Sequence, residues 1–196
     1  MEPKIIIGMP VNGKMMELTT QSIGGAIIGA GGLVIDFIVR VSADIVSSRT
    51  WLVNEAIKNG GTHILFVDSD MVFPEDVIPT LLAHNKEIVG VQYNKREFPL
   101  KPVYEPLDKE AIDARAEGKL YKANYTGMGV MLIDLSIFDK IGKGEKPTPW
   151  FNFGRDSQGA LAMGEDAWFS NVARDAGIDT WIDPTIHVGH IGNYIY

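Results

Sequence analysis

The stretch Ile64–Asp70 constrains the fold of this chain more than any other. It begins with four consecutive apolar residues, Ile-Leu-Phe-Val, and ends on two aspartates separated by a serine. An unbroken apolar run of this length predicts a strand buried on both faces, and such strands come from the middle of an α/β sheet. Ligands bind to these sheets beyond the carboxyl ends of the strands, so we expect Asp68 and Asp70 to lie in a ligand-binding crevice.

Length, charge and cysteine content limit the class of protein. The 196 residues suffice for one domain, or a tightly joined pair, with a sizeable core. A formal net charge of −7 argues against a protein that binds nucleic acid by neutralising phosphates. The chain contains no cysteine, which excludes disulfides, zinc–thiolate sites and thiol catalysis and suits a reducing cytoplasm.

Neither a leader nor a membrane span is expected. The first residues lead directly into a strand, with no charged and then apolar segment before it. The most apolar segment, Ser22–Ile35, is rich in glycine and too short to cross a bilayer. These features predict a cytoplasmic protein.

Strand and helix patterns alternate in the first half of the chain, which predicts a parallel sheet with right-handed crossovers. Apolar runs predict strands over 4–9, 33–39, 64–67 and 87–91. Between them, helices are predicted over 18–30, 50–59 and 74–84. In this interpretation Pro10–Gly13 is a turn that ends the first strand, and such a turn either binds a nucleotide or is an ordinary connection.

Arg49 stands, in this interpretation, at the start of the helix 50–59. A cation is disfavoured there because the helix macrodipole is positive at that end. Arg49 therefore either points into solvent or serves an anionic ligand such as a diphosphate.

Asp68 and Asp70 are candidate cation ligands. The alternation of side chains along a strand puts both on the same side and turns Ser69 away. Mg²⁺ and Mn²⁺ prefer carboxylate oxygens, and substrate phosphates often complete the coordination shell. Helix capping is the alternative role, but Pro74 indicates that the next helix begins several residues later.

The second half of the chain is less regular. Residues 93–119 carry Lys95, Arg96, three prolines and a short charged helix predicted over 108–117, and form either a flap over the crevice or an exposed excursion. Two short strands are then predicted around the glycine-rich bend 126–129, where the backbone can approach another group closely.

Three further features are candidates for function. Glu165 and Asp166 open a helix, where the dipole alone favours acids but a carboxylate can also accept a proton from a hydroxyl nucleophile. His187 and His190 are candidate metal ligands, with His190 preferred. Trp150 is either a core residue or a surface for a sugar.

The order of these elements resembles that of GT-A fold glycosyltransferases of the family 2 type. The resemblance covers nearly the whole chain and rests on Met9-Pro10, Arg49, Leu65–Asp70, Gly127-Met128-Gly129, Gly164-Glu165-Asp166 and Gly189-His190. It implies an α/β fold with a mostly parallel central sheet, flanking helices and a small mixed C-terminal acceptor-side region. Residues 1–92 would be the nucleotide-sugar-binding half of a single domain, and 93–196 the acceptor-side and catalytic half.

The resemblance also implies an activity, which is transfer of a sugar from a nucleoside-diphosphate sugar to an acceptor hydroxyl with Mn²⁺ or Mg²⁺. Asp166, with Glu165 beside it, would be catalytic, and Asp70, Asp68 and His190 would hold the metal. The donor would contact Pro10, Val11, Asn12, Arg49, Asp68 and Ser69. The sugar and acceptor side would be formed by Gly127, Met128, Gly129 and Trp150.

Two alternatives remain from the sequence. A nucleotidyltransferase would also use carboxylates and a metal, but it usually has a basic, glycine-rich loop after the first strand, where this chain offers only Lys14. A non-catalytic nucleotide- or carbohydrate-binding module of the same fold is the other. The acceptor, a nucleic acid included, and the oligomeric state stay open.

Overall fold

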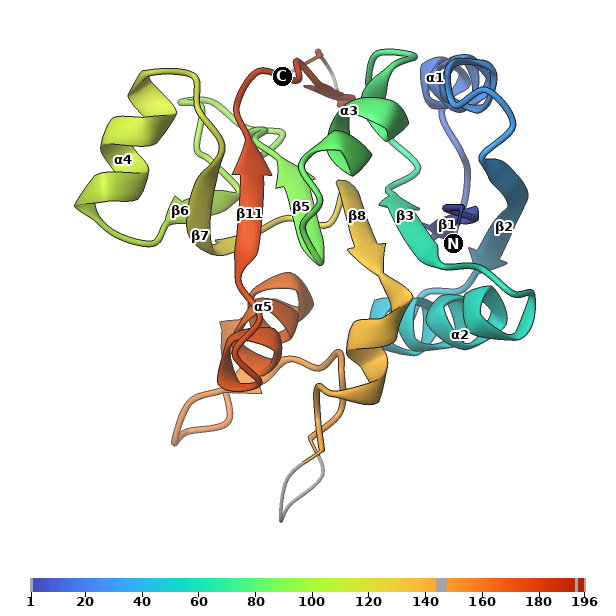
Figure 1. Ribbon diagram of the computed structural model, residues 1–196. Coiled ribbons are helices and arrows are strands. Elements are labelled where there is room, and N and C mark those ends of the chain that lie inside the picture. Colours follow the sequence, from blue (N-terminus) through green and yellow to red (C-terminus); the bar gives the residue numbers. More distant parts are fainter. Residues whose placement is uncertain (1, 144–147, 193, 196) are drawn as a thin grey trace.

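The computed structural model describes residues 2–143, 148–192 and 194–195 (Figure 1). An eight-stranded sheet in the order β2-β1-β3-β8-β5-β11-β7-β6 forms its centre. The strands of this sheet are β1 (Ile5–Val11), β2 (Val34–Val41), β3 (His63–Val67), β5 (Ile88–Val91), β6 (Tyr104–Pro106), β7 (Tyr121–Thr126), β8 (Val130–Asp134) and β11 (Thr180–Asp183). Two short pairs lie outside it, namely β4 (Met71–Val72) with β12 (Gly189–His190), and β9 (Gly154–Arg155) with β10 (Leu161–Met163).

Most strands of the central sheet run in the same direction, as predicted. β1 pairs in parallel with β2 and β3, and β5 pairs in parallel with β11. β8 runs antiparallel between β3 and β5, and β7 runs antiparallel between β11 and β6. Six strands therefore point one way, and only β7 and β8 of this sheet point the other.

Helices cover both faces of the sheet. They are α1 (Glu17–Gly29), α2 (Ile45–Lys58), α3 (Val77–Ala83), α4 (Lys109–Ala116) and α5 (Glu165–Asp175), with a short 3₁₀ helix, η1 (Leu135–Asp139). α1 and α3 lie on one face and α2 and α5 on the other, each with its own buried apolar cluster (Figure 1). In the part of the chain that the structure describes, no helix is long and apolar enough to span a membrane.

α2 begins earlier than the sequence predicted. The side chain of Asp44 accepts a hydrogen bond from the Ser47 N–H at 3.1 Å and caps the helix, so the polar residues before Arg49 are its first turn rather than a loop. Arg49 therefore does not stand at the helix start, and the argument from the macrodipole does not apply to it. It is 2% exposed, which also excludes the solvent-facing alternative.

Two other predicted boundaries are wrong. β1 runs through Val11, so Pro10 and Val11 belong to the strand and not to a turn. Proline is tolerated at this position because β3 pairs with β1 only as far as Gly8, so the missing N–H of Pro10 interrupts no bond to β3. α3 starts at Val77 instead of Pro74.

Candidate active site

A cleft of about 650 Å³ opens at the carboxyl ends of β1, β2 and β3. This is the place predicted from the buried strand that ends in Asp68 and Asp70. Most of the residues predicted to bind the donor or a metal, together with Glu165, line it: Pro10, Val11, Asn12, Arg49, Asp68, Ser69, Asp70, Glu165 and His190. His187 is exposed and is not among its lining residues.

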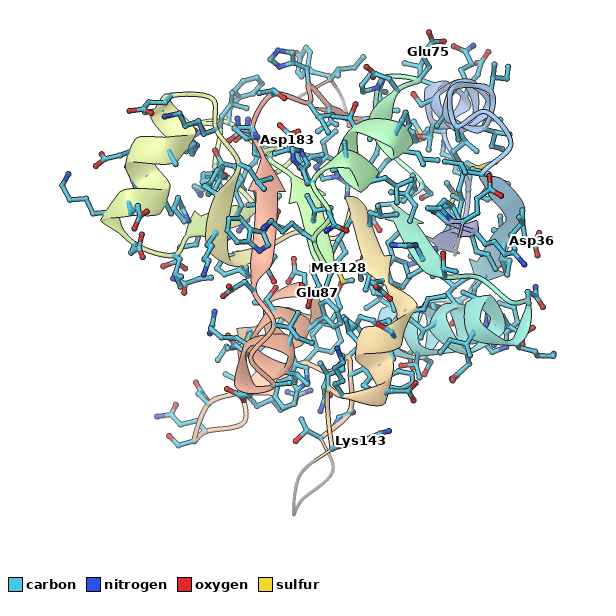
Figure 2. The ribbon with its side chains drawn as sticks, in the orientation of Figure 1. Asp36, Glu75, Glu87, Met128, Lys143 and Asp183 are labelled. Atoms are coloured by element: carbon cyan, nitrogen blue, oxygen red, sulfur yellow. The ribbon has the colours of Figure 1, made fainter. Side chains whose placement is uncertain are left out.

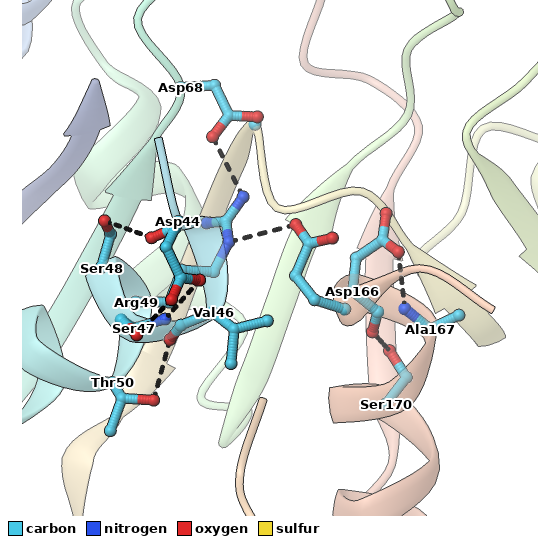
Figure 3. A network of polar contacts seen from close by, with 12 residues as sticks. Asp44, Val46, Ser47, Ser48, Arg49, Thr50, Asp68, Asp166, Ala167 and Ser170 are labelled. Carbon is cyan, nitrogen blue, oxygen red and sulfur yellow. Dashed lines mark hydrogen bonds and ion pairs between the residues drawn. The ribbon is translucent and has the colours of Figure 1, made fainter. Parts of the chain in front are cut away.

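Arg49, Asp68 and Glu165 form a group that we call the inner cluster. Arg49 Nη2 donates to Asp68 Oδ1 at 3.1 Å, and Arg49 Nε donates to Glu165 Oε1 at 3.4 Å (Figure 3). The three side chains come from α2, the end of β3 and the start of α5, so the cluster ties these elements together. Arg49 Nη1 is buried and has no hydrogen-bond partner among the described residues.

The charges of the inner cluster depend on one another. Burial opposes ionisation of Arg49, but Asp68 and Glu165 outweigh it and raise the pKa of the guanidinium. Burial raises the pKa of Asp68, and Arg49 only partly offsets this effect. One buried cation therefore pairs with two partly exposed carboxylates, and its removal would leave both carboxylates without a partner.

Asp70, His190 and Arg96 form a second group, the outer cluster. Arg96 Nη1 lies 2.7 Å from Asp70 Oδ2, and His190 Nε2 lies 3.5 Å from Asp70 Oδ1. His190 Nδ1 donates to the Asn94 carbonyl at 2.9 Å, so in the neutral imidazole the lone pair is on Nε2 and faces Asp70. The side chain of Arg96 is 52% exposed and comes from the irregular segment that the sequence predicted as a flap or an excursion.

The outer cluster holds an ionised carboxylate. Burial alone raises the pKa of Asp70, but His190 and Arg96 outweigh it and the net shift is downward. Burial alone lowers the pKa of His190, but Asp70 and the Asn94 carbonyl raise it overall. The Asp70 carboxylate and the His190 imidazole therefore lie next to each other in the lining of the cleft.

Asp70 and His190 are the side chains of the outer cluster that could hold a divalent cation. No group of three or more histidine or acidic side chains within the described residues is arranged to hold a metal ion. Asp68, predicted as a third ligand, is instead paired with Arg49. One carboxylate and one imidazole suit Mn²⁺, and a site with so few protein ligands is usual when substrate phosphates supply the rest.

The glycine-rich bend accommodates Tyr93. The Gly129 N–H donates to the buried Tyr93 hydroxyl at 2.9 Å, and a Cβ atom at Gly127 would overlap the same hydroxyl. The predicted close approach is therefore to a side chain of the protein itself. Tyr93 also packs edge-on against His190, with ring centroids 5.4 Å apart, and so lies beneath the outer cluster.

Met128 and Trp150, predicted on the sugar and acceptor side, contribute to the core instead. Met128 is 1% exposed and packs between the sheet and α5 (Figure 2). The ring of Trp150 lies 4.8 Å from that of Phe138 and packs against the same cluster. Neither residue is among those that line the cleft. An aromatic pair in the sequence is compatible with both outcomes, and here the apolar face of η1 supplies the partner.

Glu165 and Asp166 face different cavities. Glu165 lines the cleft and pairs with Arg49, whereas Asp166 lines a second cavity of about 550 Å³. Asp166 Oδ1 accepts a hydrogen bond from the Ala167 N–H at 2.7 Å (Figure 3). Burial, and to a smaller extent the neighbouring Glu165, raise the pKa of Asp166. The second cavity is also lined by Lys95, Glu105, Asn124, Tyr125, Asn171 and Arg174.

Sequence reasoning missed several residues of the cleft. Lys14 and Arg96 were noted only for their charge, and Ser42 and Ala43 were assigned to a loop, yet all four line the cleft. Asp44 could have been recognised in the sequence as an N-cap residue, because aspartate is favoured at that position. A helix that starts after Asp44 would have placed Ser42 and Ala43 directly before α2. No local signal marks Arg96 or Tyr93.

Comparison with known proteins agrees with this fold. No protein-family model matches the chain, and no curated protein matches it in sequence. In structure the chain is similar to A197 from STIV, with a TM-score of 0.65 and 15% identity over 96% of this chain and 86% of that one. It is also similar to GalNAc-T7, solved with UDP, GalNAc and Mn²⁺, with a TM-score of 0.64 and 12% identity over 97% of this chain and 44% of that one.

These similarities define the class of fold. The chain has a GT-A-like α/β fold, which it shares with a glycosyltransferase, and it spans less than half the length of that GalNAc-T7 chain. At such low identity the similarity shows the fold alone. The assignment to family 2 stays a prediction.

Proposed function

We propose that this chain is a metal-dependent glycosyltransferase that moves a sugar from a nucleoside-diphosphate sugar to an acceptor hydroxyl. The observation that carries the proposal is the position of Glu165 and Asp166 at the start of α5. One faces a cleft with Asp70, His190 and Arg49, and the other faces a second cavity. Transfer of a sugar brings two substrates together, and a carboxylate within reach of the acceptor hydroxyl can take its proton.

The cleft suits a donor that carries a diphosphate. Its cationic side chains are Lys14, Arg49 and Arg96, and the β1 residues Pro10 and Val11 form its floor with Asn12 beside them. Asp70 and His190 would hold Mn²⁺ or Mg²⁺, and such a cation offsets the negative charge that develops on a leaving diphosphate. Arg49 would act by fixing the positions of Asp68 and Glu165.

Asp166 would be the base that takes the proton of the acceptor hydroxyl. Burial raises the pKa of Asp166, which makes its carboxylate a stronger base than that of an ordinary aspartate. The second cavity, with Tyr125 and the amides of Asn124 and Asn171, offers the hydroxyl-binding groups that an acceptor needs. We therefore expect kcat/KM to rise with pH through the pKa of Asp166, above the usual 3.8.

A panel of nucleoside-diphosphate sugars tests the proposal without knowledge of the acceptor. Each donor is added with and without Mn²⁺, and both the melting temperature and the slow hydrolysis of the donor are measured. We expect one nucleotide family to stabilise the protein only with Mn²⁺, and the matching sugar donor to be hydrolysed.

Asp166→Asn separates catalysis from binding. It should leave the Mn²⁺-dependent stabilisation intact and slow hydrolysis by about 10²–10⁴-fold, the usual contribution of a general base. Asp175→Asn, an exposed residue at the other end of α5, is the matched control and should change neither. A panel with no stabilising nucleotide would contradict the proposal, and stabilisation without any turnover would favour a binding module of the same fold.

A further inference from the structure

β2 is an open edge of the central sheet. It is eight residues long, and β1 is its only strand partner among the described residues. Val39 and Val41, on the α1 face of this strand, are 39% and 68% exposed, and Ile35, where the register with β1 shifts, is 46% exposed. Edge strands of soluble proteins are normally short or protected by lysine, proline or a covering segment, because unpaired strand edges bind other strands. β2 therefore has the features of a strand that acquires a partner.

The backbone groups of alternate β2 residues point away from the sheet. The Ser42 N–H donates to the Val11 carbonyl of β1 at 2.9 Å, so by alternation Ile38 and Arg40 also turn their backbone toward β1. Phe37, Val39 and Val41 then face outward. The Phe37 N–H agrees with this, since its acceptor is the neighbouring Asp36 carboxylate at 2.8 Å rather than a strand.

The sequence of β2 is complementary to itself when it is reversed. In Val-Ile-Asp-Phe-Ile-Val-Arg-Val, Asp36 and Arg40 lie at equal distances on either side of Ile38. Both charged side chains are on the α2 face, where Arg40 lies over the Trp51 ring at 4.9 Å and Asp36 accepts from Asn59 at 3.0 Å. Asp36 is visible at the outer edge of the sheet in Figure 2.

We propose that β2 pairs antiparallel with β2 of a second copy of this chain, with Ile38 on the two-fold axis. In this register Asp36 of each copy lies opposite Arg40 of the other, and the outward N–H and carbonyl groups of Phe37 meet those of Val39. Val39 of each copy then lies opposite Phe37 of the other on the α1 face, and the exposed Val41 lies opposite Ile35, where the register of β2 with β1 shifts. The two central sheets become one, joined by an isologous interface.

The partner strand is that of a second copy, because an identical strand supplies both complementary charges in this register. Opposite charges directly across an antiparallel pair are favourable, and like charges are unfavourable. A two-fold axis through Ile38 doubles each contact, so a single substitution changes two pairs in the dimer. The clefts, at the carboxyl ends of the two β2 strands, would lie at opposite ends of the joined sheet.

Charge reversal tests the register. Sedimentation equilibrium of the full chain should show a dimer, and Asp36→Lys or Arg40→Glu should each raise its dissociation constant by about tenfold or more, since each places two like-charge pairs in the interface. The double variant Asp36→Lys/Arg40→Glu should restore dimerisation. A monomer at all concentrations, or a double variant no better than the singles, would overturn the proposal.

A disulfide tests the position of the axis independently, because the natural chain has no cysteine. Ile38→Cys should form a covalent dimer on mild oxidation, since the two Cα atoms of a non-hydrogen-bonded antiparallel pair are about 4.5 Å apart. Val41→Cys is the control: it is more exposed, but six residues of offset place its two copies about 20 Å apart. Equal or preferential cross-linking through Val41→Cys would overturn this register, and melting curves show whether each variant is folded.

Discussion

The inner and outer clusters both use an aspartate at the end of β3, but they hold it in opposite ways. Asp68 is paired with Arg49, whose side chain is 2% exposed, whereas Asp70 is paired with Arg96, whose side chain is 52% exposed. The inner cluster joins three elements of the fold, and the outer cluster joins the turn after β3 to β12 and to the irregular segment that carries Arg96. Two aspartates that are equivalent in the sequence pattern therefore differ in their partners: Asp68 is paired with a buried arginine, and Asp70 with an exposed one.

The difference follows from solvation. A buried guanidinium is tolerable only with its carboxylates in place, and removal of one partner leaves an uncompensated charge. An exposed ion pair contributes little to stability, so it can be exchanged for contacts to a bound molecule at small cost. Substitutions in the two clusters test this difference, and the largest effect is expected in the inner cluster.

Arg49→Met should lower the free energy of unfolding by up to about 3–5 kcal/mol, because it removes the buried guanidinium and leaves the partly exposed carboxylates of Asp68 and Glu165 without a cation. Urea denaturation measures this loss. Arg96→Met is the matched control in the outer cluster and should change stability by less than about 1 kcal/mol. Equal losses for the two variants would remove the distinction between the clusters.

Tyr93→Phe should cost about 1–3 kcal/mol, since it leaves the buried Gly129 N–H without an acceptor. Because Tyr93 also packs against His190, we expect the same variant to weaken Mn²⁺-dependent donor binding. Tyr104→Phe, in β6 and away from the cleft, should change the unfolding free energy by no more than about 0.5 kcal/mol. If both variants proved equally neutral, the glycine-rich bend would not depend on Tyr93.

Asp183 belongs to neither cluster, so its contribution to stability can be compared with theirs. Although burial opposes it, hydrogen bonds from Thr185 and His84 hold the pKa of Asp183 below its ordinary value of 3.8. A lowered folded pKa stabilises the protein at pH values above 3.8, and this stabilisation is lost as pH falls through the lower folded value. Asp183→Asn should therefore cost about 1–2 kcal/mol at neutral pH.

The pH dependence decides whether ionisation is the cause. Unfolding free energies of the wild type and Asp183→Asn, measured by urea denaturation from neutral to strongly acidic pH, should converge as the pH drops below 3.8. A gap that widens toward acid would show that the charge of Asp183 does not stabilise the fold.

Local patterns predicted much of the cleft. The buried run before Asp68 and Asp70 defined a strand and its end, the acids at the start of α5 were visible as a helix N-terminus, and His190 stood out among few histidines. Each of these signals lies within a few residues of the chain. The same kind of evidence predicted the five helices and six strands of the central sheet, but not β6 and β11 of that sheet or the four strands of the two short pairs.

Long-range contacts account for what the sequence did not predict. β8 enters the sheet between β3 and β5, an order that no local pattern specifies. Arg96 reaches Asp70 from an irregular segment, and Gly127 is small because Tyr93, far away in sequence, fills its space. Arg49 was expected at a helix start because Asp44 was not recognised as the cap, so its burial between two acids was not foreseen.

Calorimetric titration of Mn²⁺ tests the central claim most directly. The protein is first saturated with the nucleoside diphosphate that gives the largest thermal shift, and Mn²⁺ is then titrated into the wild type and Asp70→Asn. We predict that Asp70→Asn weakens Mn²⁺ binding by at least about 100-fold while its melting temperature without ligand stays close to that of the wild type. Unchanged Mn²⁺ affinity in the folded variant would contradict the assignment of Asp70, and with it the division of the cleft into a fixed and an available half.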